Sequence, residues 1–321
     1  MMPSLCLEPH AVQLTPPDIA RWKSGNAGAP YVYSFDSGLP GPQVLVTALV
    51  HGNEISGAMV LNDLLQQGVQ VRSGNLTLAF CNVAAFSQFD PLRPDASRYL
   101  DEDFNRVWSN DRLYGSTSNR EVERARQLLP FVQRCTHLLD LHSMHEPCEP
   151  LWVTGLLPRN IALAQSLQTG AQTVVDAGHA DGVRMRDFAQ LSSPTEDAVA
   201  LLLEAGQHWQ LSTLNHARNA LARFLLSSQT WELSDIPIGW LMPKVANNPP
   251  IEVTHKVVAR SMNFTFTESF QGGEVIAQAG TVIGYDQDEP IVTPYSECVL
   301  VMPSLRQLRA GVTVVRLGRY Y

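Results

Sequence analysis

Residue types that bind metal ions stand directly after two apolar runs of the sequence. His51 and Glu54, within His-Gly-Asn-Glu, follow residues 44–50, and His142 ends residues 137–142. A tight turn after a buried strand lets a histidine and a glutamate three positions apart face one centre. Two histidines and one glutamate leave a fourth position on zinc open for water. The three residues are therefore candidate zinc ligands. The alternatives are a glutamate placed by a helix dipole and a hydrogen-bonded histidine at a strand end.

Two further carboxylates lie beside apolar runs. Asp140 precedes His142 by two positions and is a candidate to orient an imidazole from outside the ligand set. The sequence does not tell which imidazole that is. Glu204 follows the six apolar residues 198–203. Because such neighbours desolvate a carboxylate, we expect the pKa of Glu204 to rise toward neutrality, which suits a general base. The alternative is a strand-end glutamate that faces water.

A charged segment, residues 98–106 (RYLDEDFNR), lies inside the long polar stretch 86–119. An arginine binds a carboxylate through two parallel hydrogen bonds, and an asparagine beside it adds a directed donor. A second arginine near a metal ion can stabilise an oxyanion. The segment is therefore either a clamp for an anionic substrate or an ordinary solvated loop.

Strand-like runs alternate with helix-like segments between about residues 43 and 230. The predicted strands are residues 43–50, 75–82, 137–142 and 199–206, and the predicted helices are residues 55–68, 120–134, 160–168 and 213–227. The second helix is expected to kink or end near Pro130. This alternation indicates an α/β fold, with a mostly parallel sheet and helices on both faces. Ligands of such folds bind at the carboxyl ends of the strands, where His51 and His142 would lie.

The pattern changes after about residue 235. Short strand candidates follow at residues 251–259, 262–268, 274–280, 281–285, 298–302 and 312–318. This spacing predicts a small C-terminal β domain. The Pro- and Asn-rich residues 243–250 are the expected linker, so we predict a catalytic domain at 1–242 and a β domain at 243–321.

Composition excludes several classes of protein. The 321 residues are 45% hydrophobic and 17% charged, as in a folded protein. A net charge of −8 argues against a general nucleic-acid binder. The apolar runs are far shorter than the roughly 20 residues of a membrane-spanning helix. The first thirty residues lack the pattern of a signal peptide, and the five cysteines form no CxxC pair. We therefore expect a cytoplasmic protein with reduced thiols.

Four motifs together resemble a known family. HGNE, RYLDEDFNR, DLHS and LLLEAG, in that order, are similar to the motifs of the succinylglutamate desuccinylase/aspartoacylase family, a branch of the zinc carboxypeptidase-like fold. The likeness extends over roughly residues 40–230. Beyond them, the β-rich tail matches the family's C-terminal domain in type only.

The resemblance implies a role for seven residues. His51, Glu54 and His142 would bind one zinc ion. Glu204 would act as general base and later as acid, and Arg98 would polarise the scissile carbonyl. The remaining two residues, which would hold the α-carboxylate of the substrate, are Asn105 and Arg106.

The sequence departs from the family at two points. Aspartoacylase-like members have a further substrate-binding arginine before the catalytic glutamate, but residues 187–203 contain none, and the nearest are Arg184 and Arg186. Those members also use a tyrosine of the C-terminal domain, for which Tyr285 and Tyr295 are the candidates here. Both departures put a dicarboxylic substrate in doubt and leave the metal site unaffected.

The expected function is that of a zinc-dependent hydrolase that cleaves the amide bond of an N-acylated amino acid or a related small molecule. We expect neither a nucleic-acid nor a membrane partner, and the sequence leaves homo-oligomer formation open. Two alternatives remain: a zinc carboxypeptidase that acts on a peptide C-terminus, and a non-catalytic binding protein with the same fold. Access to the pocket would separate the two enzymes, because a β domain closing over the site admits only small substrates.

Overall fold

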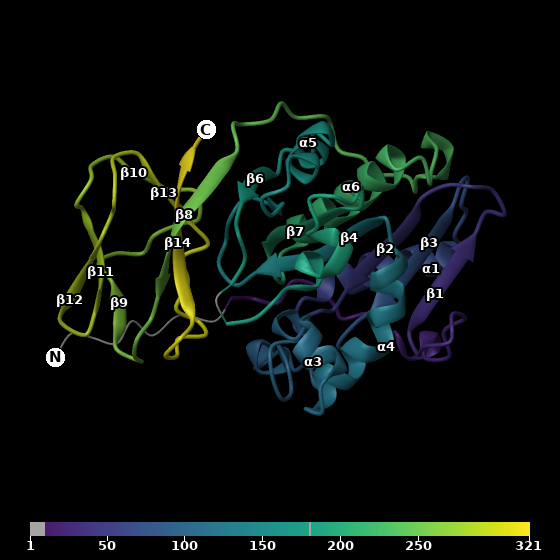
Figure 1. Ribbon diagram of the computed structural model, residues 1–321, viewed down its shortest axis with the longest axis horizontal. Helices are drawn as coiled ribbons and strands as arrows, with labels where there is room; N and C mark the ends of the chain where they lie inside the picture. The colour runs from purple at the N-terminus through teal and green to yellow at the C-terminus, as the bar shows by residue number, and fades with distance from the viewer. Residues whose placement is uncertain (1–9, 180) are drawn as a thin grey trace.

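The computed structural model describes residues 10–179 and 181–321, which form one large sheet, one small sheet and the helices around them (Figure 1). The first seven strands are β1 (Val32–Asp36), β2 (Gln43–Ala48), β3 (Asn75–Phe80), β4 (His137–Met144), β5 (Leu151–Val153), β6 (Gln172–Val175) and β7 (Val199–Gln207). The α-helices are α1 (Ile55–Gln67), α2 (Val83–Phe86), α3 (Asn110–Tyr114), α4 (Arg120–Arg134), α5 (Pro158–Ser166) and α6 (Leu211–Ser227).

Four parallel strands, in the order β3-β2-β4-β7, form the centre of the large sheet. In this register Val46 pairs with Leu139, and Leu139 pairs with Leu201. Strands buried on both faces are continuous apolar runs rather than alternating ones, which is why the sequence indicates them clearly. Strand β1 joins β3 in the antiparallel direction, and β5 joins β7 in the same way.

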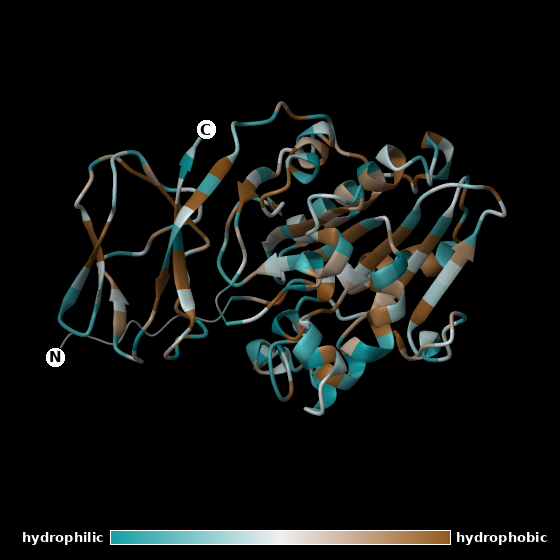
Figure 2. Ribbon diagram, in the orientation of Figure 1, coloured by the Kyte–Doolittle hydropathy of each residue, from teal (hydrophilic) through white to brown (hydrophobic). Residues whose placement is uncertain are grey.

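Helices cover both faces of this sheet. Because successive residues of a strand point to opposite faces, Leu138 and Leu139 belong to different cores. Leu139 packs in the core that contains residues of α1, α5 and α6. Leu138 packs in the core that contains residues of α4. Figure 2 shows both hydrophobic and hydrophilic residues on α4, as expected for a helix with one buried face.

Helix α4 does not end at its proline. Asn119 caps its N-terminus by accepting a hydrogen bond from Val122 N, and the helix continues past Pro130 to Arg134. An internal proline removes one backbone hydrogen bond. Phe131 and Val132 are buried beyond it, and their packing offsets this loss.

The C-terminal strands extend the large sheet. They are β8 (Ile251–Val258), β9 (Phe264–Phe266), β10 (Val275–Ile276), β11 (Val282–Asp286), β12 (Glu289–Val292), β13 (Cys298–Val301) and β14 (Thr313–Tyr320). Strand β8 pairs with β6 in parallel, and β14, β13 and β10 follow it. Strands β12, β11 and β9 form the separate small sheet.

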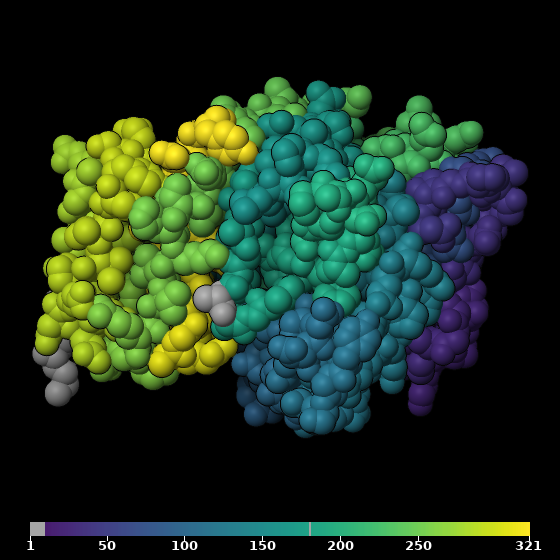
Figure 3. Space-filling view, in the orientation of Figure 1, coloured from purple at the N-terminus to yellow at the C-terminus, as the bar shows by residue number. Residues whose placement is uncertain are grey.

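This C-terminal part has a core of its own, which includes Phe264, Ile283, Leu300 and Val315. Figure 3 shows it as a block that adjoins the rest of the molecule on one side. The predicted α/β fold with a small C-terminal β region is confirmed. The domain boundary at residue 242 stays a prediction.

Two further expectations concern the membrane and the thiols. Among the described residues, no helix has the length and apolarity needed to cross a bilayer. The described cysteines, Cys81, Cys135, Cys148 and Cys298, are free, and Cys6 lies outside the described residues.

Candidate active site

The turn after β2 carries two of the predicted ligands and depends on a glycine. A side chain at Gly52 would meet Phe86 N and Ser97 O, each at 2.4 Å, so no larger residue fits there. Gly52 N donates a hydrogen bond to Arg98 O at 2.9 Å. The polar stretch 86–119 is thus packed against this turn. The turn ends at Glu54, which is the N-cap residue of α1.

The three predicted zinc ligands converge. His51 Nδ1 lies 2.6 Å from Glu54 Oε1, and His142 Nδ1 lies 2.9 Å from Glu54 Oε2. One potential ligand atom from each residue lies within 4.8 Å of the others, and all three residues are buried. Burial by itself would raise the pKa of Glu54, but the two imidazoles hold it well below its usual value.

Each imidazole contacts a second carboxylate through its Nε2 atom, the ring nitrogen that does not face Glu54. His51 Nε2 lies 3.0 Å from Asp103 Oδ1, and His142 Nε2 lies 2.9 Å from Asp140 Oδ2. Thr47 Oγ1 in turn donates to Asp140 Oδ1 at 2.6 Å. A metal-binding histidine typically donates its other ring N–H to such a carboxylate. The donor set and its orientation therefore fit a zinc ion held by two Nδ1 atoms and one carboxylate.

A buried carboxylate holds the charged segment 98–106 in place. Glu121 of α4 is fully buried, and it accepts backbone hydrogen bonds from Leu100 N at 2.8 Å and Asp101 N at 3.1 Å. It also accepts a side-chain hydrogen bond from Asn82 Nδ2 at 3.0 Å. The alternative of a merely solvated loop does not apply to this segment, because its backbone is anchored in the interior.

Three predicted substrate-contacting residues of this segment line the pocket beside the cluster. Arg98 Nη1 lies 3.4 Å from Glu54 Oε1. Asn105 Oδ1 accepts a hydrogen bond from Met185 N at 3.0 Å, and no described residue accepts one from its amide nitrogen. Arg106 Nε contacts Asp181 Oδ1 at 3.1 Å.

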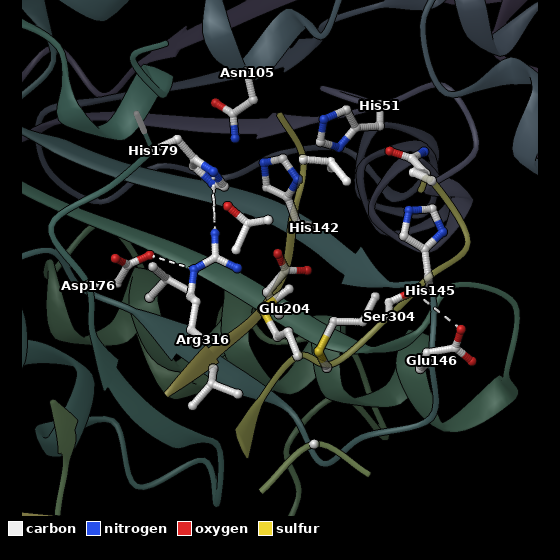
Figure 4. A pocket seen from close by; sticks show the side chains of 18 of the residues that line it. His51, Asn105, His142, His145, Glu146, Asp176, His179, Glu204, Ser304 and Arg316 are labelled. Atoms are coloured by element: carbon white, nitrogen blue, oxygen red, sulfur yellow. Dashed lines mark hydrogen bonds and ion pairs between the residues drawn. The ribbon is translucent and has the colours of Figure 1, made fainter. Parts of the chain in front are cut away.

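Glu204 is the neighbour of His142 across the β4–β7 pair. Its Oε2 atom is buried and has no hydrogen-bond partner among the described residues. Burial raises the pKa of Glu204 to about 8. A buried carboxylate oxygen without a donor is unusual in a folded protein and indicates a place for a ligand or a water molecule. Figure 4 shows Glu204 next to His142 in the pocket.

Further lining residues come from distant parts of the chain. Strand β14 and the loop before it contribute Arg316, Arg309 and Thr313, while residues 301–304 form another part of the wall. Asp176, His179 and Arg184 also line the pocket, and the first two contact Arg316. Sequence reasoning missed Asp103, His179 and Arg316. Asp103 stands within the charged segment 98–106, but nothing in its spacing relates it to His51, and the other two residues stand in no motif.

Of the two arginines and two tyrosines considered as substitutes for the family's missing substrate-binding residues, only Arg184 lines the pocket. Arg184 lines the pocket, whereas Arg186 is buried behind it and donates to Thr154 O at 2.6 Å. Neither candidate tyrosine is among the residues that line the pocket. Tyr285 is exposed, and the Tyr295 hydroxyl is bonded to Thr254 at 2.5 Å.

The fold and the cluster define a class: open α/β proteins with a candidate His2Glu metal site at the carboxyl ends of parallel strands. Residues 40–228 match the model of the succinylglutamate desuccinylase/aspartoacylase catalytic domain. The match covers more than half of the chain. The chain therefore belongs to the succinylglutamate desuccinylase/aspartoacylase family.

Individual curated relatives match only a part of the chain, at about one third sequence identity. A protein of Parasynechococcus marenigrum named probable aspartoacylase is 33% identical over 135 residues, which are 39% of this chain and 42% of that protein. An N-acyl-aromatic-L-amino acid amidohydrolase of Xenopus laevis is 31% identical over 32% of this chain and 35% of that protein. The chain thus matches less than half the length of these curated relatives.

Among solved structures, the succinylglutamate desuccinylase of Chromobacterium violaceum has a TM-score of 0.64 at 20% identity, over 91% of this chain and 89% of that one. The succinylglutamate desuccinylase of Vibrio parahaemolyticus also has a TM-score of 0.64, at 15% identity, over 91% and 86%. These similarities support the same fold.

Proposed function

We propose that this protein is a zinc-dependent amidohydrolase that removes the acyl group from an N-acylated amino acid or a related small molecule. The observation that carries the proposal is the position of Glu204. Its Oε2 atom, which has no hydrogen-bond partner among the described residues, belongs to the same pocket as the buried cluster of His51, Glu54 and His142. Membership of the family supports the same chemistry.

The cluster would hold the metal and Glu204 would handle the proton. Zinc bound by the cluster supplies a Lewis acid that lowers the pKa of water and polarises a carbonyl. Glu204 takes one proton from the attacking water, whose oxygen bonds to the amide carbon. It then passes that proton to the nitrogen as the C–N bond breaks, so that an amine and a carboxylic acid form. The acid loses the second proton of the water to the amine or to solvent, which leaves a carboxylate. A carboxyl whose pKa is raised to about 8 can both accept and donate this proton near neutral pH.

Two contacts would position the substrate. Arg98, whose guanidinium lies 3.4 Å from Glu54, would donate hydrogen bonds to the oxygen that becomes negative during attack. The Asn105 amide nitrogen and Arg106 would hold the α-carboxylate. A fixed carboxylate places the scissile carbonyl at the centre of the pocket, which reduces the entropy lost on reaching the transition state.

The shape of the pocket favours a small substrate over a peptide. Residues of the C-terminal part, including Met302, Ser304 and Arg316, form one wall. The cavity holds about 160 Å³, which is below the roughly 300–1,000 Å³ of pockets for drug-sized ligands. We therefore rank the deacylase above a carboxypeptidase. We also propose a cytoplasmic enzyme, because free cysteines are typical of reducing compartments.

The first experiment compares two substrate panels. Zinc-loaded protein is assayed on N-acyl amino acids and on short blocked peptides, beside Glu204→Gln and the control Glu252→Gln on the surface of β8. We expect free amino acid from an N-acyl compound, a loss of about 10²–10⁴-fold in Glu204→Gln and none in the control. Glu204→Gln should keep its zinc. Cleavage of peptides alone would assign a carboxypeptidase, and zinc binding without turnover would support a binding protein.

A further inference from the structure

Two arginines meet at one imidazole in the pocket. Arg106 Nη2 lies 3.1 Å from His179 Nδ1, and Arg316 Nη2 lies 3.0 Å from His179 Nε2. Arg106 belongs to the anchored segment 98–106, whereas Arg316 comes from β14. Figure 4 shows the Arg316 guanidinium between His179, Asp176 and Glu204. The pocket thus joins side chains that are far apart along the chain.

His179 is contacted by two hydrogen-bond donors but can accept from only one of them. Burial and the two guanidinium groups lower the pKa of His179, so the imidazole is neutral. A neutral imidazole has one acceptor nitrogen, and the other nitrogen carries a hydrogen. Both arginines can only donate, and neither can lose its charge. One of the two contacts therefore sets a donor against a donor. This mismatch would disappear if an acceptor lay between the two guanidinium groups.

The charges nearby also favour an anion. Arg316 Nε donates to Asp176 Oδ2 at 3.0 Å. The same carboxylate is shared with Arg184 and Lys256, each at 3.5 Å, while Asp187 pairs with Arg184 at 2.5 Å. Arg106 contacts Asp181 at 3.1 Å, so these four cationic side chains face three carboxylates. The described residues provide no hydrogen-bond acceptor for Arg316 Nη1. Among the described residues, this side of the pocket therefore has an unused donor on Arg316 and more cationic than anionic side chains.

We infer that Arg316 is a substrate-binding residue, and that it binds the same substrate carboxylate as Arg106. The inference rests on the proposed function. Nη2 atoms of both arginines lie within 3.4 Å of His179 Nδ1, so the two groups are close enough for one carboxylate to reach both. Such a carboxylate would take the place that His179 holds now. Strand β14 would thereby complete the substrate site.

Substrate selectivity tests the inference. The N-acyl amino acid with the highest turnover in the panel is compared with its primary amide, which lacks the negative charge. We expect Arg316→Gln to lower the acid-to-amide ratio of kcat/KM about 10–100-fold. Arg316→Lys should lower it less, because a lysine keeps the charge and a partner for Asp176. The matched control Arg319→Gln, on the same strand but on the surface, should leave the ratio unchanged. Equal losses on acid and amide would overturn the inference.

A labelling experiment tests the subsite without turnover. Phenylglyoxal modifies arginines, and mass spectrometry follows the modification of Arg106 with propionate or the neutral propionamide present. Propionate should slow the labelling of Arg106 in the wild type and clearly less in Arg316→Gln, while propionamide should have no effect. Equal protection in the variant would refute shared binding. If no N-acyl compound is hydrolysed but propionate still protects, the proposed reaction fails and the carboxylate subsite stands.

Discussion

The carboxylate of Asp103 lies 3.0 Å from His51 Nε2, although the polar segment that carries Asp103 is far along the chain from the turn that carries His51. Asp140 has the same relation to His142, at 2.9 Å. Each carboxylate accepts the Nε2 hydrogen and so directs Nδ1 toward Glu54. The protein itself thus fixes the orientation of the two imidazoles, one through a residue of the same strand and one through a residue of a loop.

Replacing Asp103 tests this orientation. Asp103→Asn should weaken zinc binding about 10–100-fold, because an amide holds the His51 tautomer less strongly than a carboxylate does. Competition with a coloured chelator measures the affinity. The control is Asp101→Asn, two positions away, whose carboxylate bonds Arg120 at the surface. Equal zinc affinities in the wild type and Asp103→Asn would show that the contact has no role in metal binding.

Zinc should stabilise the folded protein. A ligand that binds only the folded state adds about 2.7 kcal/mol at a free concentration of one hundred times its Kd. We expect zinc to raise the Tm of the wild type and to have little effect on His142→Ala. His255→Ala, an exposed histidine of β8, should respond like the wild type. A Tm shift that survives in His142→Ala would place the stabilising ion elsewhere.

Glu121 is expected to be important for stability although it is outside the pocket. Glu121→Ala leaves the backbone N–H groups of Leu100 and Asp101 without their acceptor in the interior. A loss of about 2–4 kcal/mol in the free energy of unfolding follows, and urea denaturation measures it. Glu123→Ala on the exposed side of α4 should change this energy by less than about 0.5 kcal/mol. The KM of Glu121→Ala should also rise, because the segment that carries Arg106 loses its anchor.

Asp176 should make the protein sensitive to acid. Burial by itself would raise the pKa of this carboxyl, but Arg316, Arg184 and Lys256 lower it below its ordinary value. A carboxylate with a lowered folded-state pKa stabilises the protein above its unfolded pKa of about 3.9, and the contribution is lost as the pH falls through the folded value.

Asp176→Asn should therefore have a lower free energy of unfolding than the wild type at pH 7, and this difference in free energy should shrink below about pH 4. Urea denaturation at pH 7, 5, 4 and 3 measures the free energy of unfolding of both proteins. Asp288→Asn, at an exposed position, should follow the wild type at every pH. A difference that stays constant down to pH 3 would mean that Asp176 contributes packing rather than charge.

The strands and the ligand cluster could be predicted because their signals are local. A strand buried on both faces is a continuous apolar run, so β2, β4 and β7 are recognisable from residues a few positions apart. Glu54 follows His51 by three positions, and the turn brings their side chains together. Parallel pairing of β4 with β7 places His142 beside Glu204. The short strands β5 and β6 escaped prediction, because three or four residues carry little periodic pattern.

The contacts that complete the site were decided by the tertiary structure alone. Asp103 reaches His51 because Glu121 holds the intervening loop against the interior, and Arg316 reaches His179 because β8 extends the large sheet and brings β14 to the pocket. Neither contact has a spacing along the chain that could indicate it. The sequence by itself determined the long buried strands, the turn and the candidate metal-binding residue types, since these depend on neighbouring residues. The partners of each candidate ligand and the wall of the pocket depend on how distant segments pack, which only the folded chain decides.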